Sequence, residues 1–179
     1  MPDISVPGVV LTDLVTHADD RGGFTELFRS SAQPHVPPSA QLNLSISRTG
    51  VLRGMHYHRT QSDYWCVMSG EAFVCLYDLR GGSLSSSAVA VISLDSSSGL
   101  TGLFIPPGVA HGFQAISDVS LLYMVDREYT GQDEFGFAWD DPDLGVGWPL
   151  ADPLLSERDS HNPSLRQAIA GAPVPATDS

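Results

Sequence analysis

Positive charge is the scarcest property of this sequence. Only 9 of its 179 residues are lysine or arginine, against 21 aspartates and glutamates, so the formal net charge is −12. No three basic residues follow one another anywhere in the chain. Nucleic acids and anionic membrane surfaces bind proteins through dense basic patches, and the sequence therefore excludes both as partners. An anionic small molecule is still compatible with this charge, because a few placed arginines are enough to hold one.

Cysteine and long apolar segments are also scarce. Cys66 and Cys75, the two cysteines, both lie in runs typical of strands, which favours buried free thiols over a disulfide. No stretch approaches the roughly 18 consecutive apolar residues of a membrane span. The first residues also lack a charged segment followed by an apolar one, as a secretory signal would have. We therefore expect a cytoplasmic protein with no membrane partner.

Short strand-like runs follow one another through the middle of the chain, separated by turn residues such as Gly70 and the segment 80–83. The expected strands cover residues 51–58, 64–69, 72–79, 88–94, 103–108, 111–116 and 120–125. Several short strands at a spacing of about 8–12 residues are typical of an all-β sandwich or barrel.

Helical signal is confined to the end of the chain. Residues 163–171 predict one short peripheral helix, with Ser164 as its N-cap and Gly171 as its stop. Residues 172–179 are typical of a flexible tail. Because the sequence has no internal repeat and no linker, we expect residues 1–179 to form a single domain.

Three histidines fall within the strand-rich region. His56 and His58 are two residues apart in the segment 50–70, GVLRGMHYHRTQSDYWCVMSG, so on a strand their side chains share one face. His111 follows a tight turn in the segment 105–113, IPPGVAHGF. Such an arrangement either builds a metal site or holds a catalytic base.

The spacing of these histidines resembles the two histidine-bearing motifs of the cupin superfamily, whose fold is a small jelly-roll β-barrel. In its metal-binding members, the positions of His56, His58, Asp63 and His111 hold one Fe, Mn, Ni or Zn ion. A longer glutamate usually stands where this chain has Asp63. The opposing interpretation makes His58 a histidine at the barrel rim and Asp63 the solvated start of the next strand.

A longer series of motifs runs from about residue 6 to residue 163. Its segments are DRGGFTE (20–26), QLNLSIS (41–47), GVLRGMHY (50–57), SGEAFVCLYDLR (69–80), IPPGVAHGF (105–113), LLYMVDREYTGQDEFGFAWDDPDLGVGWPL (121–150) and LSERDSHNP (155–163). In their order and number they resemble the dTDP-4-dehydrorhamnose 3,5-epimerase family. The resemblance implies an isomerase that epimerises a dTDP-4-keto-6-deoxysugar at C3, C5 or both, in deoxysugar biosynthesis. The ketone acidifies the neighbouring protons, so a base removes one and an acid returns one to the opposite face, without a cofactor.

The resemblance also implies roles for single residues. His56 corresponds to the base, Asp159 to the carboxylate that orients it, and Tyr123 to the acid. The positions that hold the substrate are Arg21, Glu26, Gln41, Asn43, Arg53, His111, Tyr129 and Glu134. The two arginines would offer planar, permanently charged donors to the diphosphate, although surface salt bridging is the alternative for Arg21. The family is dimeric, so the resemblance also implies a homodimer.

One local conflict arises within the expected strand 51–58. Strict alternation points Arg53 and His56 to opposite sides of a strand, whereas both are expected at the site. Gly54 lies between them and is compatible with a bulge that re-aims one of the two side chains.

Three positions depart from the family pattern. The family has a lysine where this chain has Asp63, and often a glutamine where it has His58. That lysine would stabilise the negative charge of the enolate, and a metal ion held by His56, His58, Asp63 and His111 is the alternative electrophile. Because a metal-bound His56 cannot also be the free base, a metal-dependent cupin enzyme on another substrate is the second hypothesis. Many members also carry an acidic residue at position 74, where this chain has Val74. This change and the loss of the lysine motivate a third hypothesis, a non-catalytic barrel that binds sugar nucleotides.

Overall fold

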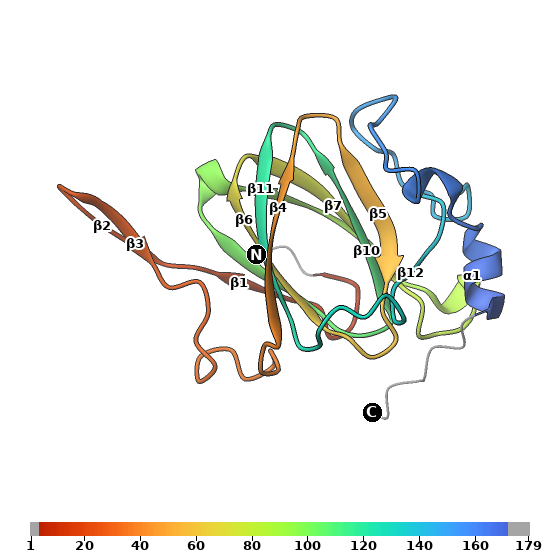
Figure 1. Cartoon of the computed structure of the whole chain (residues 1–179), viewed down its shortest axis with the longest axis horizontal. Helices are drawn as coiled ribbons and strands as arrows, with labels where there is room; N and C mark the ends of the chain where they lie inside the picture. The colour runs from red at the N-terminus through yellow and green to blue at the C-terminus, as the bar shows by residue number, and fades with distance from the viewer. Residues whose placement is uncertain (1–3, 172–179) are drawn as a thin grey trace.

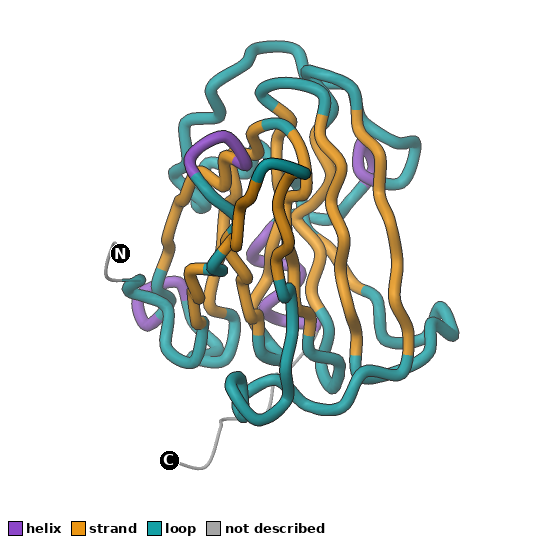
Figure 2. Tube along the Cα trace, turned by 90° about the vertical axis from the view of Figure 1, so that its left-hand side faces the viewer, coloured by secondary structure: helices purple, strands orange, loops and turns teal. Residues whose placement is uncertain are grey.

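Two five-stranded sheets form the body of the protein, seen in a computed structural model that describes residues 4–171 (Figure 1). The first sheet has the order β1 (Val10–Asp13), β9 (Thr101–Ile105), β6 (Asp63–Ser69), β11 (Val119–Val125) and β4 (Gln41–Ser47). The second has the order β12 (Phe135–Gly136), β5 (Leu52–Tyr57), β10 (Val109–Ala115), β7 (Glu71–Asp78) and β8 (Val89–Asp95). Neighbouring strands in both sheets pair antiparallel. Figure 2 shows the strands running in roughly one direction, with most loops at the two ends. The all-β, jelly-roll prediction is confirmed.

The seven strands expected from the sequence are all present, as β5 to β11, with ends shifted by at most a few residues. The largest shift is in β9, which ends at Ile105 because Pro106 has no backbone N–H for the ladder and Gly108 turns the chain with a φ of 79°. The prediction missed β1, β4 and β12, and also β2 (Thr16–Asp19) and β3 (Gly22–Thr25).

Helices are short and peripheral, as expected. Three are 3-10 turns at Leu84–Ser86, Ser96–Ser98 and Asp159–His161, and α1 spans Leu165–Gly171. Ser164 caps α1 as predicted: its Oγ accepts from the Gln167 N–H at 3.3 Å, and Gln167 Oε1 accepts from the Ser164 N–H at 3.0 Å. No helix within residues 4–171 is long and apolar enough to cross a membrane. The expected tail, 172–179, lies outside the described residues.

The main core lies between the two sheets. Trp65, Leu103 and Leu121 from the first sheet pack with Val74 and other residues of the second. A second cluster on the outer side of the second sheet joins Tyr77 to side chains of the C-terminal segment, such as Leu165. The C-terminal segment after β12 therefore covers one sheet, and the cavity described below opens between the sheets.

Strands β2 and β3 form a hairpin arm that stands away from the barrel (Figure 1). Their residues are exposed apart from partly buried Thr25, and Phe24 on the arm exposes 69% of its surface. Nothing in the described chain covers this aromatic side chain, and the arm makes its own two-stranded sheet.

Candidate active site

A cavity of about 470 Å³ opens between the two sheets. It brings together most of the residues expected at the site: His56, Tyr123, Gln41, Asn43, Arg53, His111, Tyr129 and Glu134, together with His58 and Asp63. Its walls come from β4, β6 and β11 of the first sheet and from β5 and β10 of the second. The volume is that of a small-molecule site.

Alternate side chains of strand β4 face the cavity. Gln41 and Asn43 line the cavity, and the Gln41 amide donates to Asn43 Oδ1 at 2.7 Å. Gln41 Oε1 in turn accepts from the backbone N–H of Tyr129 at 2.9 Å. This amide thereby ties the loop that carries Tyr129, which is 65% exposed, to the cavity wall.

A bulge in β5 resolves the conflict between Arg53 and His56. The pairing with β10 matches His56 with His111 and Arg53 with Phe113, so β5 carries one extra residue between the two pairs. Gly54 has a φ of 133°, and a Cβ there would lie 2.6 Å from the Gly112 Cα. Only glycine fits at this point, and both Arg53 and His56 line the cavity as a result.

His56 and Asp159 form a hydrogen-bonded pair. His56 Nε2 lies 2.5 Å from Asp159 Oδ1, and Asp159, only 4% exposed, sits behind the imidazole rather than in the cavity. The backbone N–H of Asp159 donates to Ser156 Oγ at 3.0 Å, which fixes the turn that carries the carboxylate. Burial favours the neutral carboxyl, but the hydrogen bond and the charge of His56 outweigh it and hold the pKa of Asp159 below its ordinary value.

Tyr123 lies across the cavity from this pair, on the other sheet. It is on β11, between Asn43 of β4 and Trp65 of β6 in the strand register. Burial raises the pKa of its phenol above the ordinary value, and the nearby carboxylates of Asp63 and Glu134 raise it further. The hydroxyl is therefore a proton donor over the physiological range.

Glu134 and Arg158 form an ion pair at the cavity wall, with Arg158 Nη1 2.6 Å from Glu134 Oε1. Burial raises the pKa of Glu134, but hydrogen bonding to Arg158 and its charge outweigh burial, so the pKa lies below its ordinary value. Arg53 and Arg158 supply the permanent positive charge of the cavity, and the chain contains no lysine.

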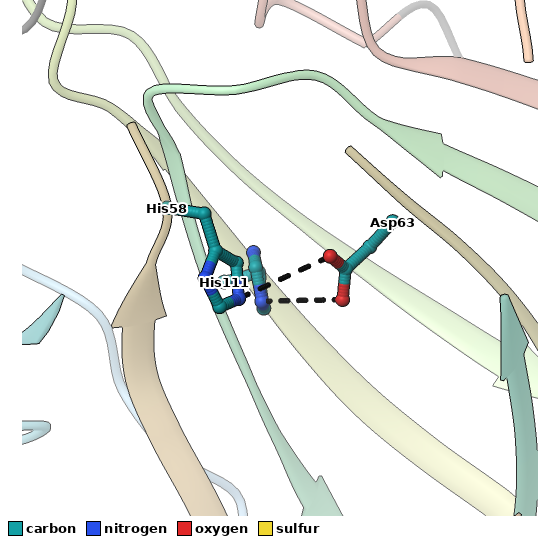
Figure 3. Close-up of side chains that lie close together, drawn as sticks. All are labelled: His58, Asp63 and His111. Atoms are coloured by element: carbon teal, nitrogen blue, oxygen red, sulfur yellow. Dashed lines mark ion pairs between the residues drawn. The ribbon is translucent and has the colours of Figure 1, made fainter. Parts of the chain in front are cut away.

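His58, Asp63 and His111 form a second group in the same cavity (Figure 3). One ligand atom from each lies within 4.8 Å of the others, and His58 and Asp63 are only 8% and 4% exposed. This burial overturns the interpretation of His58 as a rim histidine and Asp63 as a solvated strand start. Burial also lowers the pKa of His111 to about 4, so its ring is neutral. His56, the fourth ligand expected from the sequence, is not a member of this group.

The structure does not bring Arg21 and Glu26 to the cavity. Arg21 sits at the tip of the β2–β3 arm and pairs with Asp19 at 2.5 Å, so it makes the surface salt bridge that was the alternative for this residue. Glu26 pairs with Arg29 at 2.6 Å, just beyond the arm. Both residues are on a segment that leaves the barrel, which the sequence motifs did not reveal.

A family model described as dTDP-4-dehydrorhamnose 3,5-epimerase matches residues 3–167. The chain belongs to this family of carbohydrate epimerases. It is 35% identical to a dTDP-4-dehydrorhamnose 3,5-epimerase of Streptomyces griseus, over 93% of this chain and 87% of that protein. It is 32% identical to a dTDP-4-dehydro-6-deoxyglucose 3-epimerase of Streptomyces bikiniensis, over 94% and 90% of the two chains.

Solved structures in the family have the same fold. The rmlC epimerase of Mycobacterium tuberculosis superposes with a TM-score of 0.87 at 32% identity, covering 98% of this chain and 92% of that one. A 3'-monoepimerase of Streptomyces bikiniensis, solved with dTDP-quinovose, also gives 0.87 at 30% identity and covers 98% and 92%. The resemblance drawn from the motifs is confirmed.

Sequence reasoning missed some cavity residues of this family member. Arg158 lies next to Asp159 in the motif LSERD, and Gln61 and Trp65 flank Asp63, yet none was predicted to face the cavity. The sequence did offer one signal for Arg158: basic residues are scarce, with only 9 in the chain, and this one lies beside Asp159. Val74, in contrast, lies in the core between the sheets and does not line the cavity.

Proposed function

We propose that this protein epimerises a dTDP-4-keto-6-deoxysugar at C3, C5 or both. The observation that carries the proposal is one cavity with a histidine–carboxylate pair on one wall and a tyrosine on the facing wall. Inversion at a carbon beside a ketone needs a base on one face of the sugar and an acid on the other. His56 and Tyr123 come from opposite sheets and meet that requirement.

The roles of the three residues follow from their contacts. Asp159 holds Nε2 of His56, so Nδ1 takes the proton from carbon, and the charge of Asp159 stabilises the imidazolium that forms. The electrons of the broken C–H bond move to the ketone oxygen as an enolate. Tyr123 then gives its proton to the opposite face, and proton exchange with solvent restores both groups.

Arginine is the diphosphate partner that the cavity offers. The Arg53 guanidinium is held at the cavity by donating to Ser47 Oγ at 3.0 Å, and Arg158 faces the same space. A guanidinium binds phosphate through two parallel hydrogen bonds, which suits the dTDP part of the substrate.

Deuterium exchange tests the reaction directly. Wild-type protein is incubated in deuterated water with dTDP-4-keto-6-deoxyglucose, and the sugar is followed by NMR. We expect deuterium at C3, at C5 or at both, together with a new diastereomer. A sugar recovered without deuterium at either carbon overturns the epimerase and leaves the non-catalytic binding barrel, which would show ligand-induced stabilisation without turnover.

We also propose that two copies of the chain associate through the outer face of β4 and the β2–β3 arm. Leu42, Leu44 and Ile46 alternate with the cavity residues of β4 and expose 59%, 61% and 70% of their surfaces. β4 is the edge of its sheet, and Phe24 on the arm is equally uncovered. A second copy would bury this apolar surface and pair the free edge. It would also give Arg21 and Glu26 a cavity to reach, that of the partner.

Light scattering after gel filtration tests the association. We expect wild-type protein to have twice the mass of one chain and Leu44→Asp to have the mass of one. Val91→Asp is the matched control, because Val91 is also an exposed apolar residue, at 49%, on the edge strand of the other sheet. A monomeric wild type, or a Leu44→Asp variant that stays dimeric, contradicts the proposal.

The free thiols support a reducing compartment. Cys66 and Cys75 are both buried and unpaired, as predicted, and burial raises their pKa values to about 11 and about 12. We propose the cytoplasm on this basis, and fractionation of the producing cells checks it.

A further inference from the structure

The group His58, Asp63 and His111 has no part in the proton transfers proposed above. All three side chains are buried in the wall of the cavity that holds His56 (Figure 3). His58 follows the end of β5, Asp63 begins β6, and His111 lies on β10, so three strands from both sheets converge on one point.

The backbone fixes the tautomer of both histidines. Nδ1 of His111 lies 3.1 Å from the carbonyl oxygen of Val109, and Nδ1 of His58 contacts the carbonyl oxygen of Asp133. A carbonyl only accepts, so each ring carries its hydrogen on Nδ1 and presents the lone pair of Nε2. Metal-binding histidines are commonly oriented by a contact of this kind.

Both lone pairs face the same carboxylate. His58 Nε2 is 3.9 Å from Asp63 Oδ1, and His111 Nε2 is 3.8 Å from Asp63 Oδ2. These separations are too long for hydrogen bonds, and two lone pairs beside a buried carboxylate repel one another unless a cation lies between them. Gln61 and Trp65 donate to Asp63 at 3.0 and 3.1 Å, which orients the carboxylate without supplying that cation.

We propose that His58, Asp63 and His111 bind one divalent transition-metal ion in the cavity wall. Two imidazoles and one carboxylate are the ligand set that Zn²⁺ and Fe²⁺ take in sites with open positions. Ligand atoms about 2.1 Å from one ion lie roughly 3.4 Å apart in a tetrahedral arrangement, so the two measured N–O separations of 3.9 and 3.8 Å shorten by about 0.4–0.5 Å on binding.

This ligand set leaves His56 free, because Asp159 already holds its Nε2. The metal and the base therefore do not compete for one residue, as they would with four ligands. Resting on the proposed function, an ion held by His58, Asp63 and His111 would supply a Lewis acid beside the sugar ketone without a change of its oxidation state, while His56 takes the proton. The ion thereby takes the role of the lysine that the family places where this chain has Asp63.

Metal binding is measured separately from activity. Protein treated with a chelator and dialysed is titrated with Co²⁺ alone, and the visible absorption of the ion is recorded. We expect one ion per chain, with bands of protein-bound Co²⁺, and an affinity reduced at least about 100-fold in Asp63→Asn and His58→Ala. His161→Ala is the control, because His161 is exposed and hydrogen-bonds only within its own turn. Melting temperatures measured without metal show whether each variant folds.

Asp63→Lys restores the family's residue and separates the two proposals. We expect this variant to bind no Co²⁺ and to exchange deuterium equally well with and without metal, whereas the wild type loses at least about tenfold of its exchange rate on metal removal. A folded wild type that takes up no Co²⁺ overturns the metal site, and the epimerase proposal is then still judged by deuterium alone. A wild type that binds Co²⁺ yet exchanges equally well without it overturns the ion's role at the ketone.

Discussion

Two groups of histidine and aspartate lie at the cavity, and they differ in whether a hydrogen bond joins the imidazole to the carboxylate. In the first group, His56 Nε2 and Asp159 Oδ1 are 2.5 Å apart and share a hydrogen. Figure 1 shows β5, which carries His56, beside the C-terminal segment that carries Asp159. In the second, the His58 and His111 nitrogens stay 3.9 and 3.8 Å from Asp63 with no hydrogen between them. The same residue types thus occur in two arrangements, one of which suits proton transfer and the other the binding of a cation.

The difference comes from what the other ring nitrogen contacts. His58 and His111 each give their Nδ1 hydrogen to a backbone carbonyl, so the nitrogen that faces Asp63 has none to donate. His56 has its carboxylate at Nε2, so the hydrogen lies between them. Tautomer, rather than residue identity, separates a proton-transfer pair from a set of metal ligands.

The largest expected effect comes from removing the base. In His56→Asn the amide cannot take a proton from carbon, and we expect deuterium exchange to fall by about 10³-fold or more. NMR of the sugar in deuterated water measures it. His161→Asn, at an exposed histidine near Asp159 in the sequence, should stay within about threefold of the wild type. A similar loss in both variants would argue against a specific role for His56.

Replacing Asp159, the partner of His56, has the next largest expected effect. In Asp159→Asn the amide no longer stabilises the imidazolium, and we expect kcat to fall by about 10²–10³-fold with little change in KM. Steady-state kinetics with the keto sugar measure both constants. A change confined to KM would show that Asp159 supports binding and not proton transfer.

Tyr123→Phe separates removal of the proton from its return. We expect inversion to fall by about 10²-fold, while deuterium still enters with retained configuration because His56 can give a deuteron back to the same face. In the wild type the phenol must be protonated to act, and its raised pKa extends activity upward, so inversion should decline only above about pH 10. A decline that begins near pH 8 would contradict this assignment of the acid.

The smallest expected effect among these variants is one on folding, at the bulge that aims Arg53 and His56. Gly54→Ala places a Cβ 2.6 Å from the Gly112 Cα at a φ of 133°, and we expect it to lower the free energy of unfolding by on the order of 3 kcal/mol. Gly82→Ala is the matched control, with a φ of 65° and no atom within 4 Å, and should cost about 1 kcal/mol. Urea unfolding of both variants gives the difference.

The sequence predicted the barrel because its central strands carry strong local signals. β5 to β11 are apolar on at least one face and are bounded by turn residues, so periodicity locates them. The sequence did not predict β2 and β3 because their residues are exposed and show no apolar alternation. β4 escaped because its apolar residues point outward and its polar ones line the cavity, the reverse of an ordinary surface strand.

Most members of the candidate site were predictable from the sequence, but their grouping was not. Family motifs pointed to His56, Tyr123 and Asp159; the first two line the cavity, and Asp159 hydrogen-bonds to His56 from behind it. Which histidines would group around Asp63 depends on ring orientation and on the carbonyls of Val109 and Asp133, and no local sequence pattern encodes those contacts. The position of Arg21 depends on the direction of the β2–β3 arm, and local sequence patterns do not predict that direction either.

The absence of lysine has a chemical consequence for a pocket proposed to hold a ketone. A side-chain amine that has lost its proton can condense with a carbonyl to form an imine, whereas a protonated ammonium or a guanidinium does not. Arg53 and Arg158 carry the positive charge of the cavity as guanidinium groups, which keep their protons and are not nucleophilic. A ketone bound as proposed would therefore meet no side-chain amine of this chain, and the acidic C–H bonds beside its carbonyl would be the positions open to reaction.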